Sequence, residues 1–228
     1  MIYVTGDLHG HIDIHKFSSS AFPKGRDLTR SDYVIICGDF GLIWERDSRK
    51  DKYWLKWLDK KPWTTLWIDG NHENFELLDE YPVEEWQGGK VQKITDNIIH
   101  LCRGSLFELD DKRVFAFGGA ESHDKQYRKV GKSWWADEMP TYEEMEYGRK
   151  TLNTAGWNVD IVLTHSLPSR IQNDFFNDDE YKTNALTDYF DEIDNRLDFK
   201  MWFSGHYHKS MKYDEKHILV YNDIIRVT

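Results

Sequence analysis

Short apolar runs, each followed by glycine, histidine or an acidic residue, dominate the pattern along this chain. Runs of about four to eight apolar, β-branched or aromatic residues are typical of buried strands. The pattern therefore predicts strands in both halves of the chain, at residues 1–5, 33–37, 64–68, 160–164 and 200–204.

Segments with helical periodicity lie between these strands. Residues 48–60 carry Tyr53, Trp54, Trp57 and Leu58 at helical spacing, which predicts an amphipathic helix. In the helix expected over 141–153, Thr141 and Glu144 have the spacing of a capping box. Further helices are expected at 74–81 and 184–197, a helix fragment with a loop at 16–30, and loops at 122–139 and 173–180.

The middle of the chain has a different texture, with short strands joined by turn residues. Strands are predicted at 90–94, 98–102, 105–109 and 113–117, with a hairpin turn at 110–112, and three more at 210–213, 218–221 and 224–227. Strand–helix alternation in both halves, with hairpins between, indicates an α/β or α+β layered domain with mixed sheets. We expect residues 1–228 to form a single domain.

Five of the predicted buried strands are followed at once by residues of the metal-binding types. If these strands are neighbours and run in one direction, their carboxyl ends meet at one edge. In extended backbone, Asp7 and His9 would also point to the same face. The edge would then present Asp7, His9, Asp39, Asn71, His165, His206 and His208.

These seven side chains offer nitrogen and oxygen ligands and no thiolate. One ion with open positions needs about three to five ligands, so seven suggest two ions that share a ligand. Imidazole, carboxylate and amide oxygen together favour Mn²⁺, with Fe, Zn or Ni as alternatives. A lone strand-end histidine is more often a hydrogen-bonded structural residue, and the hypothesis depends on several such positions coinciding.

Composition and charge exclude several other classes. The formal net charge of −10 disfavours non-specific binding to nucleic acid or to a membrane surface, because phosphates repel it. No apolar run approaches the ~18 residues of a membrane helix, and the strand expected from Met1 leaves no room for a signal peptide. Two cysteines do not make a disulfide framework. The expectation is a cytoplasmic protein; its oligomeric state stays open.

The motifs Asp7-x-His9, Gly38-Asp39, Gly70-Asn71-His72-Glu73, His165 and Gly205-His206-x-His208 resemble the five signature blocks of the calcineurin-like metallophosphoesterases, in the family's order. The resemblance implies a four-layer αββα sandwich with two mixed β-sheets and a two-metal centre. It implies Asp7, His9, Asp39 and His208 on one ion, with Asp39 bridging to a second ion held by Asn71, His165 and His206. It also implies that His72 faces the substrate, as proton donor to the leaving group or as a phosphate contact.

The expected reaction is hydrolysis of a phosphomonoester or phosphodiester, on a small or nucleotide-type substrate, by attack of a metal-bound hydroxide. Asp39 and His72 are the expected catalytic residues. One alternative is a nuclease or nucleic-acid end-processing phosphatase, which the acidic charge disfavours. A second is a binding scaffold without catalysis. The presence of a ligand residue at every ligand position of the motifs argues against this alternative.

The chain also departs from the family pattern. Leu42 stands where many relatives carry the polar partner of the catalytic histidine, and Leu42-Ile43-Trp44 replaces the Asp-Arg-Gly run of the phosphoprotein phosphatases. Glu73 or Glu45 are candidates to orient His72. The candidates to bind phosphate are Arg46, Arg103 and Arg128, and for each the alternative is solvated surface charge. Around Arg128, Trp134 and Trp135 fit either a nucleotide contact or a cap on the core.

Overall fold

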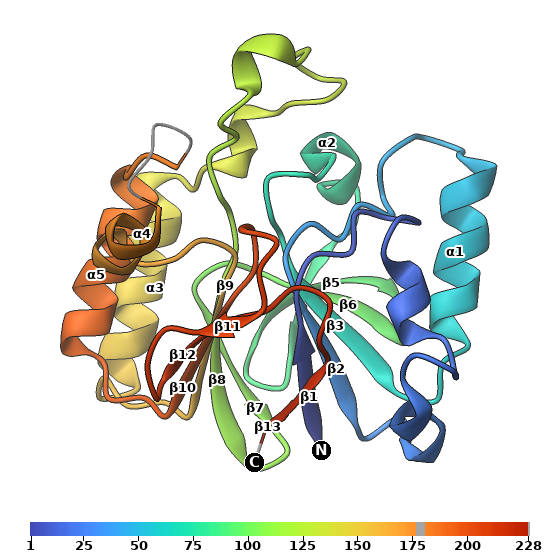
Figure 1. Ribbon diagram of the computed structural model, residues 1–228, viewed down its shortest axis with the longest axis horizontal. Helices are drawn as coiled ribbons and strands as arrows, with labels where there is room; N and C mark the ends of the chain where they lie inside the picture. The colour runs from blue at the N-terminus through green and yellow to red at the C-terminus, as the bar shows by residue number, and fades with distance from the viewer. Residues whose placement is uncertain (177–180, 228) are drawn as a thin grey trace.

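The computed structural model describes residues 1–176 and 181–227. Two β-sheets lie face to face, and helices cover the outer face of each (Figure 1). Both sheets contain parallel and antiparallel pairs. The predicted four-layer αββα sandwich with two mixed sheets is therefore confirmed.

The first sheet has the strand order β13-β1-β2-β3-β6-β5-β4. Its central strands, β1, β2, β3 and β6, pair in parallel, and the outer strands are antiparallel to their neighbours. The strands are β1 (Ile2–Thr5), β2 (Tyr33–Cys37), β3 (Thr64–Ile68), β4 (Val83–Trp86), β5 (Gly89–Thr95), β6 (Ile98–Leu101) and β13 (Ile225–Val227).

The second sheet has the order β11-β12-β10-β9-β8-β7. Here β8, β9, β10 and β12 pair in parallel, while β7 and β11 are antiparallel edges. The strands are β7 (Ser105–Leu109), β8 (Lys112–Phe117), β9 (Ile161–Thr164), β10 (Met201–Ser204), β11 (Met211–Lys212) and β12 (His217–Leu219).

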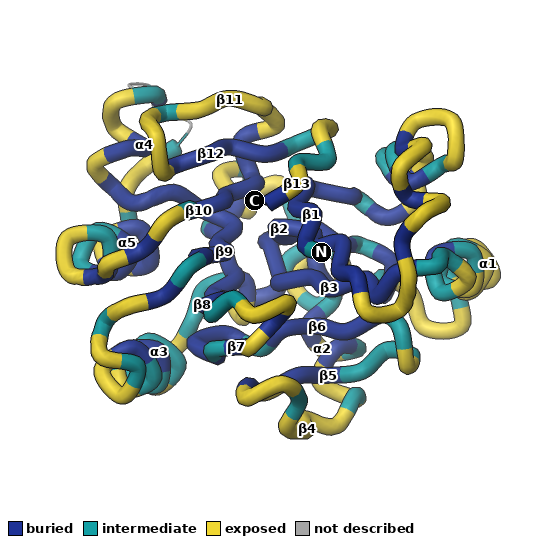
Figure 2. Tube along the Cα trace, turned by 90° about the horizontal axis from the view of Figure 1, so that it is seen from below, coloured by how far each residue is buried: buried dark blue, intermediate teal, exposed yellow. Residues whose placement is uncertain are grey.

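Apolar side chains fill each interface between layers. Between the sheets, residues such as Ile35 and Phe203 are fully buried, and Figure 2 shows the central strands as buried and the outer surfaces of the helices as exposed. Trp67 and Trp202 anchor the helices to the outer faces of the two sheets. The helices are α1 (Arg49–Asp59), α2 (Phe75–Leu78), α3 (Tyr142–Thr154), α4 (Ser169–Phe175) and α5 (Ala185–Arg196).

Local sequence signals explain several element boundaries. Ser48 caps α1 by accepting a hydrogen bond from the Asp51 amide at 3.1 Å. Thr141 and Glu144 form the predicted capping box at the start of α3. The β7–β8 hairpin turns at Asp110 and Asp111, whose φ values of 48° and 59° fit a two-residue turn of the type that matches strand twist. Lys112, predicted in the turn, instead begins β8.

The structure corrects three predictions. β4 was not predicted, because Glu84 and Glu85 lie exposed on an edge strand and leave no apolar alternation. The loop predicted at 173–180 is wrong for Asn173–Phe175, which belong to α4; residues 177–180 lie outside the described residues. The segments predicted as a helix fragment at 16–30 and a loop at 122–139 contain short 3₁₀ helices, Ile14–Phe17, Pro23–Asp27, Lys125–Tyr127 and Ala136–Glu138.

The helices are also too short or too polar to span a bilayer; within residues 1–176 and 181–227 none reaches the length and apolar character that a membrane crossing needs.

Candidate metal centre

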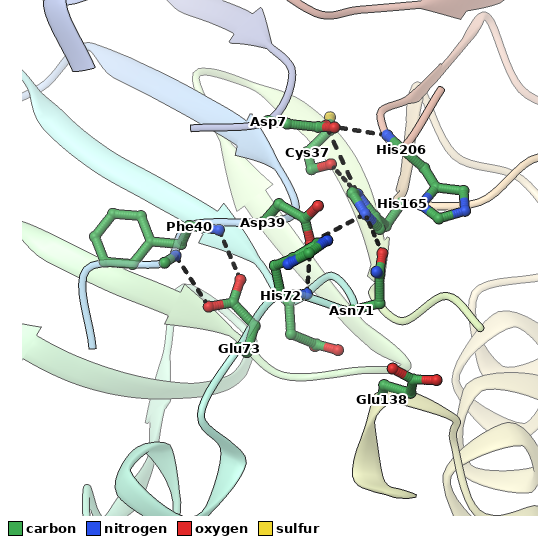
Figure 3. Close-up of polar contacts among 12 residues, drawn as sticks. Asp7, Cys37, Asp39, Phe40, Asn71, His72, Glu73, Glu138, His165 and His206 are labelled. Atoms are coloured by element: carbon green, nitrogen blue, oxygen red, sulfur yellow. Dashed lines mark hydrogen bonds and ion pairs between the residues drawn. The ribbon is translucent and has the colours of Figure 1, made fainter. Parts of the chain in front are cut away.

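The candidate ligands lie at the carboxyl ends of five strands, β1, β2 and β3 of the first sheet and β9 and β10 of the second. Each of these strands is a parallel neighbour of another, so their ends share one edge of each sheet. Because the two sheets face each other, the two edges meet, and the side chains converge between them (Figure 3).

Asp7, His9, Asp39 and His208 form one group, with a ligand atom from each lying within 4.8 Å of the others. His9 Nε2 lies 3.2 Å from Asp39 Oδ2, and His208 Nε2 lies 3.2 Å from Asp7 Oδ2. This is the set that the resemblance assigns to one ion.

Asn71, His165 and His206 form a second group on the other side of Asp39. Asn71 Oδ1 lies 3.3 Å from His165 Nε2, and the rings of His165 and His206 are 5.0 Å apart. His165 Nε2 lies 3.3 Å from Asp39 Oδ1, whereas Asp39 Oδ2 faces His9. The two oxygens of Asp39 thus point to different groups, which is the arrangement a bridging carboxylate needs.

The backbone around these residues is unusual. β1 ends at Thr5, so the expectation that extended backbone brings Asp7 and His9 together is wrong. His9, Asp39, His206 and His208 instead have φ values of 47°, 50°, 70° and 48°. Non-glycine residues in this left-handed region each store strain of roughly 1–3 kcal/mol and cluster at functional sites.

Two glycines allow the close packing of this region. A Cβ on Gly38, whose φ is 95°, would lie 2.0 Å from His165 Nδ1. A Cβ on Gly70 would lie 2.2 Å from Asp39 Oδ1. Both distances are shorter than any van der Waals contact, so glycine is required where these strand ends pass the ligand side chains.

Hydrogen bonds behind the ligands fix which atom of each faces the centre. His165 Nδ1 donates to the Cys37 carbonyl at 2.7 Å, which leaves Nε2 toward Asp39. Asn71 Nδ2 donates to Ser122 Oγ at 3.1 Å, which leaves Oδ1 toward His165, and Ser122 Oγ in turn donates to Glu138 Oε2 at 2.6 Å. Such supports set ligand orientation and tautomer in metal sites.

Sequence reasoning missed the roles of Ser122, Glu138 and Lys16. The Lys16 ammonium donates to the carbonyl oxygens of Asp7 and Tyr221 at 2.8 Å each, and the Tyr221 ring stacks on His208. These residues come from segments predicted as loops or helix fragments, and no spacing in the sequence pointed to them.

Electrostatics at the centre is set by burial and by the two carboxylates. Burial lowers the pKa of His165, but Asp39 and Asp7 outweigh it and raise that pKa to about 10. Burial and the neighbouring His165 lower the pKa of His206 to about 3. Although burial opposes it, the neighbouring imidazoles hold the pKa of Asp39 well below its usual range.

The donor set fits divalent ions. Asp7 Oδ2 is buried and, although His208 Nε2 lies 3.2 Å away, it accepts no well-aligned hydrogen bond, whereas buried carboxylate oxygens are normally satisfied. Imidazole nitrogens, carboxylate oxygens and one amide oxygen surround the same space, as borderline divalent metals require.

His72 lies beside this centre, and its partner is Arg128. The His72 amide donates to Asp39 Oδ1 at 2.8 Å. The Arg128 guanidinium lies with Nη1 3.3 Å from His72 Nδ1 and Nη2 3.1 Å from Nε2, and Asp124 Oδ1 holds its Nε at 2.6 Å. Burial, reinforced by Arg128, lowers the pKa of His72.

The other two candidate phosphate ligands lie elsewhere. Arg103 is buried, and its guanidinium donates to Asp69 Oδ2 from Nε at 2.9 Å and from Nη2 at 2.6 Å. The prediction that Arg103 binds phosphate is therefore wrong, because these donors are used inside the fold. Arg46 is exposed and forms a bidentate pair with Glu80. Neither arginine is brought to the centre.

Of the two candidates to orient His72, Glu73 needs correction. Both oxygens of Glu73 accept backbone amides, from Phe40 at 2.6 Å and from Gly41 at 3.1 Å. Glu73 therefore holds the turn that carries Asp39, and burial together with Asp39 raises its pKa well above the usual range. Glu45 lines a cavity with His72, and Leu42 is buried in the core.

Comparison with known proteins agrees with this geometry. The family model for calcineurin-like phosphoesterases matches residues 1–210. The chain belongs to the calcineurin-like phosphoesterase family. This membership confirms the predicted family and supports the predicted class of enzyme, a phosphoric ester hydrolase, and the family uses divalent metals.

Curated relatives include lariat debranching enzyme A of Xenopus laevis, 24% identical over 91% of this chain and 42% of its own length. The lariat debranching enzyme of Danio rerio is 23% identical over 91% of this chain and 40% of its own length. The chain thus spans less than half the length of these relatives. Among solved structures, phosphopantetheinyl hydrolase of Mycobacterium tuberculosis has 14% identity and a TM-score of 0.42 over 97% of this chain and 89% of that one.

Proposed function

We propose that the protein hydrolyses phosphoesters, monoesters or diesters of small or nucleotide-type molecules, with two divalent ions and Mn²⁺ as the favoured metal. The observation that carries the proposal is the pair of ligand groups that share Asp39, one oxygen facing each group. A centre for a single structural ion would not need a carboxylate aimed both ways.

Each group would hold one ion. Asp7, His9, Asp39 and His208 would bind one, and Asp39, Asn71, His165 and His206 the other. When bound, two divalent ions supply Lewis acidity toward phosphate oxygens and lower the pKa of a water to roughly 7. Side chains of the protein would bind the substrate and contact the leaving group.

Arg128 would supply the permanent positive charge for the substrate. Its guanidinium, held by Asp124, lies against His72 and next to the Asp39 side of the centre. A guanidinium is a good partner for phosphate oxygens, and it stays charged at any working pH. In this position Arg128 would bind a non-bridging oxygen of the ester.

His72 would donate a hydrogen to the oxygen of the leaving group. Because its pKa is lowered, the imidazole is neutral at pH 7, and a neutral imidazole still presents one N–H donor. Arg128 would then carry the charge and His72 the directed hydrogen bond, which stabilises the departing oxygen while that oxygen takes its proton from solvent water.

The experiment combines metal content with turnover. Protein reconstituted with Mn²⁺ is expected to hold two ions per chain and to hydrolyse an aryl phosphomonoester or diester, and chelator should remove both ions and activity. His206→Ala should reduce the metal content to one ion and abolish turnover. His100→Ala, a buried histidine bonded to Gln92 rather than to the centre, is the matched control and should keep two ions.

Two ions without hydrolysis of either ester would favour the non-catalytic scaffold. Fewer than two ions in the reconstituted wild type would contradict the two-metal proposal itself. The ion count comes from metal analysis alone, so the two-metal proposal is tested separately from turnover on either ester.

A further inference from the structure

Two cavities of about 390 Å³ each open on the candidate metal centre and share no lining residue. The first, here called the His206 cavity, is lined by Ser166, Asn184 and His206 among others. The second, here called the Trp44 cavity, is lined by His9, Trp44 and His72 among others. Both volumes fall in the range of small-molecule sites.

The cavities lie on different sides of Asp39. His9 and His72 contact Asp39 on the side of the first sheet, and Trp44, in the connection between β2 and α1, lines the same cavity as these two histidines. His165 contacts the other oxygen of Asp39 and packs against His206 (Figure 3). A phosphorus atom held at the metal centre therefore has room for one substituent toward each cavity.

The Trp44 cavity has an aromatic wall and an exposed apolar side chain. Ile12 has 65% of its surface exposed. The backbone of Trp44 is fixed at both ends, since its amide donates to Asp51 Oδ2 at 3.3 Å and its carbonyl accepts from Asn74 Nδ2 at 2.8 Å. Trp135 packs edge-on against the indole at 5.6 Å. The indole is thus a prearranged surface on which a planar group can stack.

The His206 cavity is polar by contrast. Its walls include Ser166, Gln172, Asn184 and Thr187 with the Lys125–Glu121 ion pair. The rings of His123 and Tyr181 also line it, so this cavity suits a hydroxyl-rich group such as a sugar or a polar ring. The two cavities therefore differ in the chemistry they accept, as the two ends of an asymmetric substrate would.

We propose that the substrate is a phosphodiester whose leaving group stacks a planar aromatic ring, such as a nucleobase, on Trp44, and whose other substituent occupies the His206 cavity. The leaving group is placed at Trp44 because His72, the proposed donor to the leaving oxygen, lines that cavity. Water adds an oxygen to phosphorus, the P–O bond to the leaving group breaks, the departing oxygen takes a proton, and a monoester remains. This inference rests on the proposed hydrolase function.

The first test measures binding of a leaving-group product, so it does not require turnover. Mn²⁺-loaded protein is titrated with adenosine by calorimetry. Wild type is expected to bind, and Trp44→Ala to bind about tenfold more weakly, since one base stacked on an aromatic side chain contributes an effect of about this size. Trp44→Phe keeps a ring and should stay within about threefold of wild type.

Two further variants make the titration decisive. Trp44→Leu keeps apolar packing against Trp135 but offers no ring, so its binding should be weakened about as much as is expected for Trp44→Ala. It therefore tests the stacking even if the alanine variant folds poorly. Tyr53→Ala removes an exposed aromatic ring of α1 that does not line the cavity and should bind as wild type. No binding to wild type, or equal binding by wild type and Trp44→Leu, overturns the assignment of the cavity.

The second test compares turnover. An aryl phosphodiester should show kcat/KM at least about tenfold above that of the matching aryl monoester, because only the diester fills both cavities. A preference for the monoester overturns the diester inference. If neither ester is hydrolysed, the proposed function fails, while the adenosine titration still decides whether Trp44 forms a ring-binding site.

Discussion

Two neighbouring strands of the first sheet are each followed by a buried aspartate, yet the two aspartates have different kinds of ion-pair partner. Asp39 follows β2, Asp69 follows β3, and each is about 1% exposed. Asp69 Oδ2 is paired with the guanidinium of Arg103 at 2.6 Å, and His100 lies 3.3 Å from the other oxygen. Across residues 1–176 and 181–227, no lysine or arginine forms an ion pair with the carboxylate of Asp39 or Asp7.

The difference in partners distinguishes a buried carboxylate that stabilises the fold, Asp69, from one that is available for function, Asp39. A guanidinium stays protonated at every accessible pH, so Asp69 has a permanent counter-charge within the fold. Among the described residues, the ion-pair partners of Asp39 and Asp7 are imidazoles, whose protons can leave and whose nitrogens can then serve as metal ligands. A buried carboxylate costs several kcal/mol unless it is paired or coordinates a metal. The Asp69 pair is complete, whereas we propose that divalent cations from solution complete the Asp39 centre.

The largest expected effect follows from neutralising the shared carboxylate. Asp39→Asn should lower kcat/KM on any phosphoester by on the order of 10³ or more, since one change weakens both ligand groups. The fold should persist, because an asparagine oxygen can still accept from the His72 amide at the site of the present 2.8 Å bond. Steady-state kinetics measures the loss of kcat/KM, and thermal melting of the metal-free protein shows whether the fold persists. A well-folded Asp39→Asn protein with full turnover contradicts the assignment.

The matching change at Asp69 should act on stability instead. Arg103→Met leaves the Asp69 carboxylate buried without its cation, which should lower the free energy of unfolding by about 3–5 kcal/mol. Urea unfolding measures the loss, and kcat/KM per folded molecule should change little. Adding Asp69→Asn removes the unpaired charge and should restore part of the stability. If Arg103 instead bound substrate phosphate, Arg103→Met would raise KM without loss of stability.

A third test concerns the one predicted phosphate-binding arginine that lies at the centre. Arg128→Ala should raise KM about 10- to 100-fold with a smaller effect on kcat, because a hydrogen bond to a charged group contributes about 1.5–3 kcal/mol. Arg46→Ala is the control, since Arg46 pairs with Glu80 at an exposed position and should leave KM unchanged. Equal effects of the two substitutions would show that long-range charge, not contact, is responsible.

The comparison also shows how far the sequence predicts such a site. Asp7, Asp39 and His165 could be expected to converge because each follows an apolar run, and parallel strands bring their ends to one edge. Arg103 and Glu73 could not be placed, because their partners depend on long-range packing: Arg103 reaches Asp69 34 residues away, and Glu73 reaches the Phe40 amide across 33. Spacing shows that a polar residue lies near the edge, but it does not show which way its side chain turns.

The same limit prevented prediction of the residues that support the ligands and of strand β4. Ser122 lies in a segment without periodicity and reaches Asn71 only through the packing of the second sheet against the first. β4 is an exposed edge, where charged residues protect against unwanted pairing and also remove the strand pattern. Regular strands and long capped helices were predictable, whereas side-chain partners between distant segments were not.

A third group of imidazole and carboxylate side chains, around His217, extends this comparison. The prediction that it supports has the smallest expected effect. His217 lies between Asp214, 3.0 Å from Nδ1, and Asp194, 3.1 Å from Nε2, while Arg170 pairs with the other oxygen of Asp194. Burial lowers the pKa of His217, but the two carboxylates outweigh it and raise that pKa above 6.5. His217 therefore holds its proton to higher pH than an ordinary imidazole, and the protonated ring completes this group without a metal.

Because the folded-state pKa of His217 is raised, its contribution to stability is fully present below about pH 6.5, the unfolded value, and is lost as pH rises through the folded-state pKa. His217→Gln should remove this pH dependence, so the difference in urea midpoint between wild type and variant should shrink from about pH 6 to pH 9. A difference that stays constant over that range would mean that His217 is neutral in the fold and that its two carboxylates do not hold a proton on the ring.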